Sequence, residues 1–357
     1  MTHISAIAPI SDFMSAQAEG LISLRPHALD ADMVVANYTP AQQYRNIWDA
    51  VTLASRGLIF RMSDGEIVAR PFGKFFNHGD PKTDHIDTSG AIEVMDKADG
   101  SCGILYKAPD GRFSVSTRGS MHSKQAEHAT DLYRERYEPI WTPHEDYTFV
   151  FEIIYPEGRI VLDYKGMDDL ILLGAVNKAT GISVNRAELE SFNWPGPIIE
   201  MFEFNSYIDV FRAEQVSGRE GFVVRFVDSD ARIKVKFEDY LMLHRFTFDL
   251  TKRRVWAILA SVETDINIDE WLMQVPDEFT EEARGWRDEL RAAYADILSK
   301  AEAAYAAHAH LASNRREFAQ ALIASGASAP VKAVVFAMCD GSDDERISGI
   351  IWKALKV

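Results

Sequence analysis

Lys97-Ala98-Asp99-Gly100 decides the interpretation of this chain, because the residue types that such a motif needs follow it in a fixed order. Glu152 lies in a Phe-Val-Phe-Glu-Ile-Ile stretch, Glu220-Gly221 opens a second apolar stretch, and Lys234-Val-Lys236 closes the series. A lysine can attack phosphorus, carboxylates can manage a metal or a ribose, and paired cations can hold a polyphosphate. One Lys-x-Asp-Gly motif alone is weak evidence for such a site, but the ordered set predicts a site that transfers a nucleotide.

Strand periodicity adds geometry to the last motif. In a strand over residues 232–237, Lys234 and Lys236 share one face and the apolar residues share the other, with the two ammonium groups about 7 Å apart. A solvent-facing amphipathic strand shows the same pattern. By the same alternation Glu152 lies on an apolar face, and Glu220 shares a face with Phe222 and Val224, where a structural salt bridge is the commoner role. A functional role for these carboxylates and lysines is favoured only because they occur in order with Lys97.

Other stretches around Lys97 resemble those of one enzyme family. They are Ser55-Arg-Gly-Leu-Ile-Phe60, Arg70-Pro-Phe-Gly-Lys-Phe-Phe-Asn77, Ser116-Thr-Arg-Gly-Ser120, Tyr155 to Tyr164, and Tyr240-Leu-Met-Leu-His244. With the ordered motifs they resemble the RNA ligase 1 family of phages, a branch of the covalent nucleotidyltransferases related to the ligase domains of fungal tRNA ligases. The resemblance covers residues 34 to 245. Its most specific part is Lys-Phe-Phe-Asn, which DNA ligases and capping enzymes do not usually carry.

The resemblance implies a three-step reaction on ATP and RNA. A free lysine has a pKa near 10.4, and lowering it by about 3 units takes about 4 kcal/mol, which nearby cations can supply. Neutral Lys97 would attack the α-phosphorus of ATP in line, release pyrophosphate and carry AMP. AMP would then pass to the 5′-phosphate of an RNA, and a 3′-hydroxyl would displace it.

The resemblance also implies roles for individual positions. Lys97 matches the nucleophile, and Glu152 and Glu220 match carboxylates that touch ribose or hold metal-bound water. The cations that match nucleotide or phosphate contacts are Arg56, Lys74, Arg118, Lys234 and Lys236. ATP and Mg²⁺, with Mn²⁺ as a substitute, are the implied cofactors. Asp265 falls near a family position linked to metal, although the local match is poor.

Three neighbours of these residues have expected structural roles. Gly100 and Gly221 are expected where close backbone approach leaves no room for a side chain. Asp99 either orients Lys97 or caps the turn, and the sequence favours neither. Cys102 is expected to be a small buried residue.

The order of elements predicts an α+β fold. Turn signals at Ser63-Asp64-Gly65 and Pro109-Asp110-Gly111 predict hairpins, and alternation predicts further strands up to residue 237. Beyond about Leu241 helical periodicity takes over: Thr280 can cap a helix, Asn314 can begin another, and residues 342–345 form a capping box. We expect an adenylyltransferase domain of antiparallel sheets with flanking helices over residues 1–245, and an all-α, RNA-selecting domain over residues 246–357.

Composition limits which binding partners and which cellular compartment we expect for this protein. The net charge of −16 argues against a protein that coats nucleic acid, but not against an enzyme that binds one RNA end through local clusters. Lys252-Arg253-Arg254 and Arg315-Arg316 are such clusters, although solvated helix faces are the commoner explanation. Cys102 and Cys339 are the only cysteines, and no apolar run reaches membrane-spanning length. We expect a cytoplasmic monomer that binds no membrane.

Three functions compete. The leading prediction is an ATP-dependent RNA ligase that joins a 5′-phosphate to a 3′-hydroxyl in single-stranded RNA or a tRNA loop, as in RNA or tRNA repair. A DNA ligase or capping guanylyltransferase normally continues into an OB-fold barrel, whereas this tail is helical. A non-catalytic RNA-end sensor would be expected to lose the nucleophile or a carboxylate, and this chain keeps Lys97, Glu152 and Glu220.

Overall fold

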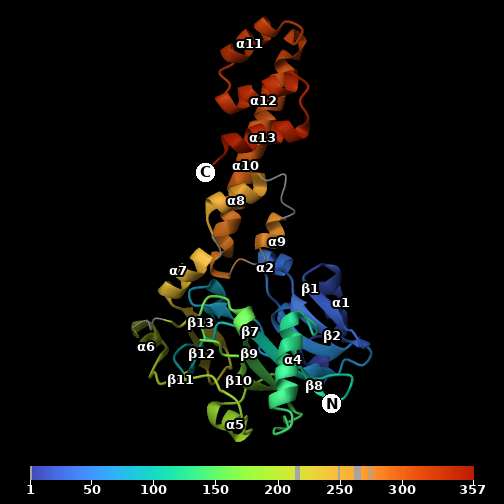
Figure 1. Ribbon diagram of the computed structural model, residues 1–357, viewed down its shortest axis with the longest axis vertical. Helices are drawn as coiled ribbons and strands as arrows, with labels where there is room; N and C mark the ends of the chain where they lie inside the picture. Colours follow the sequence, from blue (N-terminus) through green and yellow to red (C-terminus); the bar gives the residue numbers. More distant parts are fainter. Residues whose placement is uncertain (1, 214–217, 248–249, 261–266, 273–274, 276) are drawn as a thin grey trace. The chain divides into compact units, whose positions relative to one another are not determined.

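The computed structural model describes residues 2–213, 218–247, 250–260, 267–272, 275 and 277–357 (Figure 1). The chain divides into two compact units, Met1–Leu243 and His244–Val357. Unit 1 contains three sheets, and every regular element described after Lys236 is helical. No helix among these residues is long and apolar enough to cross a membrane. The predicted α+β fold, with antiparallel sheets followed by helices, is confirmed.

The first sheet is antiparallel, in the order β1-β2-β3-β4. Its strands are β1 (Ile22–His27), β2 (Asp30–Tyr38), β3 (Arg56–Arg61) and β4 (Ile67–Ala69). One face packs with helices α1 (Ile10–Ala18) and α3 (Ala50–Ala54), where Phe13 meets Phe60. The other face packs Val35 and Ile59 against Ile104 and Tyr106 of the second sheet. Both faces are therefore buried.

The second sheet is also antiparallel, in the order β10-β9-β7-β8. Its strands are β7 (Ser101–Lys107), β8 (Phe113–Thr117), β9 (Tyr147–Ile154) and β10 (Asp169–Asn177). Helix α4 (Lys124–Arg136), for which Ser123 is the N-cap, lies against this sheet in Figure 1. Tyr133 of the helix and Phe149 and Phe151 of β9 share one core with the surrounding aromatic residues.

The third sheet has the order β11-β6-β12-β13-β5 and is antiparallel except for the parallel pair β13–β5. Its strands are β5 (Phe76–Asn77), β6 (Ile92–Asp96), β11 (Met201–Phe202), β12 (Gly221–Phe226) and β13 (Arg232–Lys236). Ile233, Val235 and Phe237 enter one core with Phe222 and Val224. The predicted alternation is thus confirmed for β13, and its lysines lie on the opposite face.

The remaining elements are all helical, and those before β13 are at most six residues long. Those before β13 are η1 (Ile4–Ala6), α2 (Pro40–Arg45), η2 (Pro81–Thr83), η3 (Pro156–Gly158), α5 (Arg186–Ser191) and α6 (Tyr207–Arg212). Those after it are α7 (Glu238–Thr247), α8 (Lys252–Ala260), α9 (Ile268–Leu272), α10 (Asp277–His308), η4 (Ala309–Leu311), α11 (Arg315–Ala324), α12 (Ala329–Cys339) and α13 (Asp344–Ala354). The core of unit 2 contains the fully buried residues Phe318, Val334 and Ile351.

Two of the predicted helix starts in unit 2 are wrong by a few residues. Thr280 lies inside α10, and its hydroxyl donates to the carbonyl of Val275 rather than capping the helix. The N-cap of α13 is Asp343, not Ser342, because the carboxylate of Asp343 accepts from the amide of Arg346. Asn314 does cap α11, as predicted.

Candidate active site

The candidate nucleophile and lysine pair meet on one face of the third sheet. Lys97 directly follows β6, and its amide donates to the carbonyl of Gly221 on β12 (2.9 Å). Cross-strand pairing sets Gly221 opposite Lys236, and it sets Val223 opposite both Met95 and Lys234. The sheet therefore presents one row with Lys97 and Lys236 and a second row with Met95, Val223 and Lys234.

Glu220 joins the two lysines of the first row. Its Oε1 lies 2.7 Å from Lys97 Nζ and 2.8 Å from Lys236 Nζ, and the Glu220 side chain is 3% exposed. The expected alternation, which placed Glu220 beside Phe222 and Val224, is wrong. Gly221 has a φ of +147°, a conformation that L side chains rarely adopt, and this turn of the backbone lets Glu220 reach the lysine face.

Glycines permit both close approaches in the site. A Cβ at Gly221 would lie 2.1 Å from the Val235 carbonyl oxygen, and one at Gly100 would lie 2.5 Å from the Ile153 carbonyl oxygen. Both distances are far inside van der Waals contact with backbone atoms that cannot swing away. The predicted reason for Gly100 and Gly221 is confirmed.

Glu152 is on β9, opposite Cys102 of β7, and its Oε1 accepts from the amide of Gly100 (3.0 Å). Burial raises the pKa of the Glu152 carboxyl to about 7; the cation of Lys97 opposes the shift, and the anion of Glu220 adds to it. The site thus holds a carboxyl that titrates near neutrality, which is common at functional sites.

The raised pKa of Glu152 predicts how stability depends on pH. The folded protein holds this proton more tightly than the unfolded chain, whose value is 4.5, so stability should fall as pH rises from about 4.5 to 7. Glu152→Gln removes the ionisable group. Its unfolding free energy relative to wild type should therefore be higher at pH 8 than at pH 5, as urea titrations at both pH values would measure. Glu302→Gln, at an exposed position of α10, should show no such change. An identical difference at both pH values would contradict the assignment.

A cavity of about 520 Å³ opens on this face, within the usual size range of ligand pockets. Of the predicted site residues, the ones that line it are Arg56, Lys97, Arg118, Glu152 and Lys234. Met95 and Val223 add apolar surface beside Lys97. Glu220 and Lys236 join the site through Lys97. The cavity thus offers a nucleophile and cations together with an apolar bed for a flat ring.

Lys74 is held by aromatic rings beside this cavity. Its Nζ lies 5.0 Å from the ring centroid of Tyr38, 5.5 Å from that of Trp48 and 5.7 Å from that of Phe76. Tyr38 Oη also accepts from Arg118 Nη1 at 2.9 Å, so Tyr38 links two of the predicted phosphate-binding cations. Tyr38 and Trp48 were not among the predicted site residues, because single aromatic residues outside a motif give no signal in the sequence.

Asp99 orders a loop and does not contact Lys97. Its Oδ2 accepts from the amides of Val161 and Leu162 at 2.9 and 2.8 Å, and its Oδ1 accepts from the Tyr240 hydroxyl at 2.8 Å. The Asp99 amide donates to Tyr164 Oη. Tyr164 and Tyr240 belong to stretches that the sequence analysis quoted without assigning them a role. Neither expected role, orienting Lys97 or capping the turn, is seen in these contacts: the Asp99 carboxylate anchors the loop at Val161 and Leu162 and the hydroxyl of Tyr240.

The carboxylates suit a metal that is held partly by substrate. Among the described residues no group of three or more His, Cys, Asp and Glu side chains could hold a metal ion. Asp265, the third predicted ligand, lies outside the described residues. Mg²⁺ keeps several waters and is usually bound by one or two carboxylates together with substrate phosphates. Glu152 and Glu220 lie beside a space large enough for a phosphate, which fits this mode of Mg²⁺ binding.

Comparison with known families decides the class of this site. A family model described as RNA ligase, of the T4 RNA ligase 1 type, matches residues 54–246, a little over half of the chain. The chain belongs to the T4 RNA ligase 1 family. All the predicted site residues except Asp265 fall inside the match to this family.

The curated relatives of this T4 RNA ligase 1 family member share limited sequence identity with it. A candidate RNA ligase of Thermovibrio ammonificans is 31% identical over 133 residues, 35% of this chain and 34% of that protein. A candidate bifunctional polynucleotide kinase/RNA ligase of Autographa californica nuclear polyhedrosis virus is 26% identical over 241 residues, 60% of this chain and 34% of that protein. The chain thus spans about a third of the length of these curated relatives.

Solved structures give weaker matches. An archaeal ATP-dependent RNA ligase is 16% identical, with a TM-score of 0.43 over 78% of this chain and 75% of that one. A Naegleria gruberi RNA ligase variant with ATP and Mn is also 16% identical, with a TM-score of 0.35 over 44% of this chain and 52% of that one. Scores this low do not establish a common fold.

Proposed function

We propose that this protein joins RNA ends with ATP, through AMP linked to Lys97 and then AMP linked to the RNA. The observation that carries the proposal is the contact set of Lys97, which meets the carboxylate shared with Lys236 at the end of a cavity that also holds Glu152. Membership of an RNA ligase family supports RNA as the substrate. The name of an ATP-dependent RNA ligase among the similar structures supports ATP as the nucleotide.

The first step forms a bond between Lys97 Nζ and the α-phosphorus of ATP while pyrophosphate leaves. Lys97 Nζ is held in a salt bridge with Glu220, so attack requires that this contact be broken and that the amine present its lone pair to phosphorus. Phosphates bound beside Lys97 would compete with Glu220 for the ammonium groups of Lys97 and Lys236. Nucleotide binding would in this way loosen Lys97 from Glu220.

Glu152 and Glu220 are the carboxylates that would hold Mg²⁺ or Mn²⁺, through water and together with the phosphates. When bound, the ion would stabilise the charge that develops on the leaving pyrophosphate. Arg118 and Lys74, which both contact the Tyr38 hydroxyl, are proposed to contact the outer phosphates. The purine would lie on Met95 and Val223, which line the cavity next to Lys97.

RNA or tRNA repair is the proposed context, and the C-terminal region, residues 246–357, is proposed to select the RNA. The basic clusters of that region are partly neutralised: Lys252 pairs with Glu289 at 2.7 Å, and Arg315 pairs with Asp340 at 2.6 Å. Exposed ion pairs of this kind are weak, so both cations remain accessible to phosphate.

We predict a preference for RNA ends over nicked DNA. Single-stranded RNA with a 5′-phosphate and a 3′-hydroxyl should be joined or circularised in the presence of ATP and Mg²⁺, as gel analysis of labelled strands would show. The same RNA without its 5′-phosphate should not react, because it offers no acceptor for AMP. Sealing nicked duplex DNA much faster than RNA would refute the proposed substrate.

A further inference from the structure

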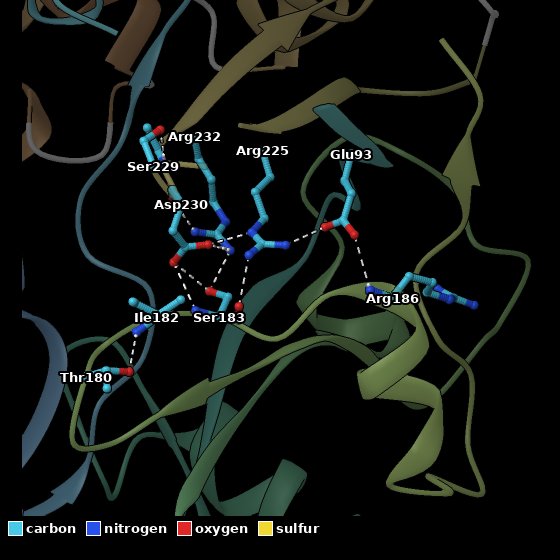
Figure 2. A network of polar contacts seen from close by, with 10 residues as sticks. Glu93, Thr180, Ile182, Ser183, Arg186, Arg225, Ser229, Asp230 and Arg232 are labelled. Carbon is cyan, nitrogen blue, oxygen red and sulfur yellow. Dashed lines mark hydrogen bonds and ion pairs between the residues drawn. The ribbon is translucent and has the colours of Figure 1, made fainter. Parts of the chain in front are cut away.

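Four charged side chains, two buried arginines and two partly buried carboxylates, form a network on the pocket face of the third sheet. Figure 2 shows Arg225 of β12 between Glu93 of β6 and Asp230, which lies in the turn from β12 to β13. Cross-strand pairing places Arg225 directly opposite both Glu93 and Arg232. The side chains of Arg225 and Arg232 are 5% and 8% exposed. This is the third row of the face, after the rows of Lys97 and of Met95.

The contacts of the network are short and nearly saturated. Arg225 Nη1 lies 2.7 Å from Glu93 Oε2, and Arg225 Nε lies 2.5 Å from Asp230 Oδ1. Arg232 Nη2 donates to Ser183 Oγ at 2.6 Å and lies 3.3 Å from the same Asp230 Oδ1. Like charges directly opposite one another repel. Asp230 is therefore what allows Arg225 and Arg232 to lie side by side.

Arg232 is also a wall of the nucleotide pocket. It lines the cavity, and its guanidinium carbon lies 4.4 Å from the ring centroid of Phe72, another lining residue. Beyond this wall a second cavity of about 20 Å³ reaches Glu93 and Arg225. Lys97 follows Glu93 by four positions, about 13 Å along the direction of β6. The network thus lies at the end of the pocket away from Lys97, where the base of a bound nucleotide would end.

Stability alone does not account for such a network. Replacing buried ion pairs with well-packed apolar residues is often neutral or stabilising, whereas breaking one pair is costly. Register is a different matter, because a slip of one residue moves every side chain of a strand to the other face. In β13 that slip would turn Lys234 and Lys236 to the opposite face of the sheet, away from Lys97. The charged row penalises it, since Arg232 would lose Asp230 and Ser183.

We propose that Arg225 and Arg232 are positioning residues for adenylyl transfer. With Glu93 and Asp230 they keep β6, β12 and β13 in the register that brings Lys97, Glu220 and Lys234 together, and they close the base end of the pocket. The inference rests on the proposed function for its chemistry. Its geometry concerns nucleotide binding by the pocket and is testable separately.

Asp230→Asn is the sharpest test, because it leaves the two arginines facing each other without their shared anion. In protein shown by circular dichroism to be folded at the assay temperature, the KM for ATP should rise and the single-turnover rate of Lys97 adenylylation should fall about tenfold to a hundredfold, as expected for a displacement of about 1 Å. Arg232→Lys should be intermediate. Asp230→Asn with Arg232→Met should recover part of the loss, since the pair of Arg225 with Glu93 stays balanced.

Arg134→Met is the matched control. Arg134 of α4 bonds the Phe113 carbonyl, Ser114 and Asp110 away from the pocket, so it should lower stability without changing the kinetics. The proposal is overturned if Asp230→Asn lowers only the melting temperature, or if Arg134→Met changes KM as much. Two measurements separate the two proposals. Absence of an AMP adduct on the wild type would refute the proposed function. Calorimetric titration with ATP tests the network by itself, and weaker ATP binding by Asp230→Asn would still support it.

Discussion

Lys97→Ala should abolish the covalent AMP adduct altogether. Wild-type protein incubated with ATP and Mg²⁺ should gain the mass of one AMP through a bond that survives base and is released by acid, because a phosphoramidate joins nitrogen to phosphorus. GTP should give no adduct. Intact-mass spectrometry of the wild type and the variant measures the result. Lys107→Ala, at a lysine on β7 that pairs with Glu145 and is 52% exposed, should label like the wild type.

The same variant separates the steps of the reaction. RNA that already carries AMP on its 5′-phosphate no longer needs the nucleophile, so Lys97→Ala should still seal such RNA when ATP is omitted. An undiminished adduct on Lys97→Ala, or none on the wild type, would remove the basis of the proposed mechanism. Sealing of pre-adenylylated RNA by a protein that forms no adduct would instead place the defect in the first step alone.

Gly221→Ala should have the second largest effect. Gly221 combines a φ of +147° with only 2.1 Å between a new Cβ and the Val235 carbonyl oxygen. The backbone must shift to admit the methyl group, and the shift moves the neighbouring Glu220 away from Lys97 and Lys236. We expect the rate of adenylylation to fall about a hundredfold or more, because displacements of about 1 Å have effects of that size.

Gly111→Ala is the control for backbone strain. Gly111 lies in the β7–β8 turn with a φ of +83°, and nothing lies within 4 Å of its Cβ position. It should lose about 1 kcal/mol of stability through the positive φ and keep its activity. Rapid-quench measurements of adduct formation and thermal melts of both variants compare the two. Equal rates for Gly221→Ala and the wild type would show that the close contact between β12 and β13 does not position Glu220.

Local patterns in the sequence were sufficient for much of the fold. Alternation over residues 232–237 identified β13 and its two faces, and the turn signals at Gly65 and Gly111 identified the hairpins β3–β4 and β7–β8. Such features depend on neighbours a few residues apart, where side-chain periodicity and turn chemistry act directly. The start of α13 was misplaced because capping residues stand in a row at Ser342, Asp343 and Asp344, and α10 begins at Asp277, before the predicted cap Thr280.

The candidate site was partly within reach of the sequence. The order of Lys97, Glu152, Glu220 and the two lysines named its members, because residue types suited to one chemistry recur in a familiar order. The sequence did not say that Glu220 would bridge Lys97 and Lys236, since the conformation of Gly221 reverses the alternation there. Nor did it predict the contact of Asp99 with the hydroxyl of Tyr240, 141 positions away.

Only the tertiary structure decided how the pocket is closed. Glu93, Arg225, Asp230 and Arg232 come from separate strands and a turn, and each taken alone is an ordinary charge on an amphipathic segment. Their partnership arises from the strand order β6-β12-β13, in which residues up to 132 positions apart become neighbours. Tyr38 and Trp48 reach Lys74 in the same way. Local sequence carries periodicity and turn chemistry, whereas the pairing of buried charges depends on long-range register, which no short pattern encodes.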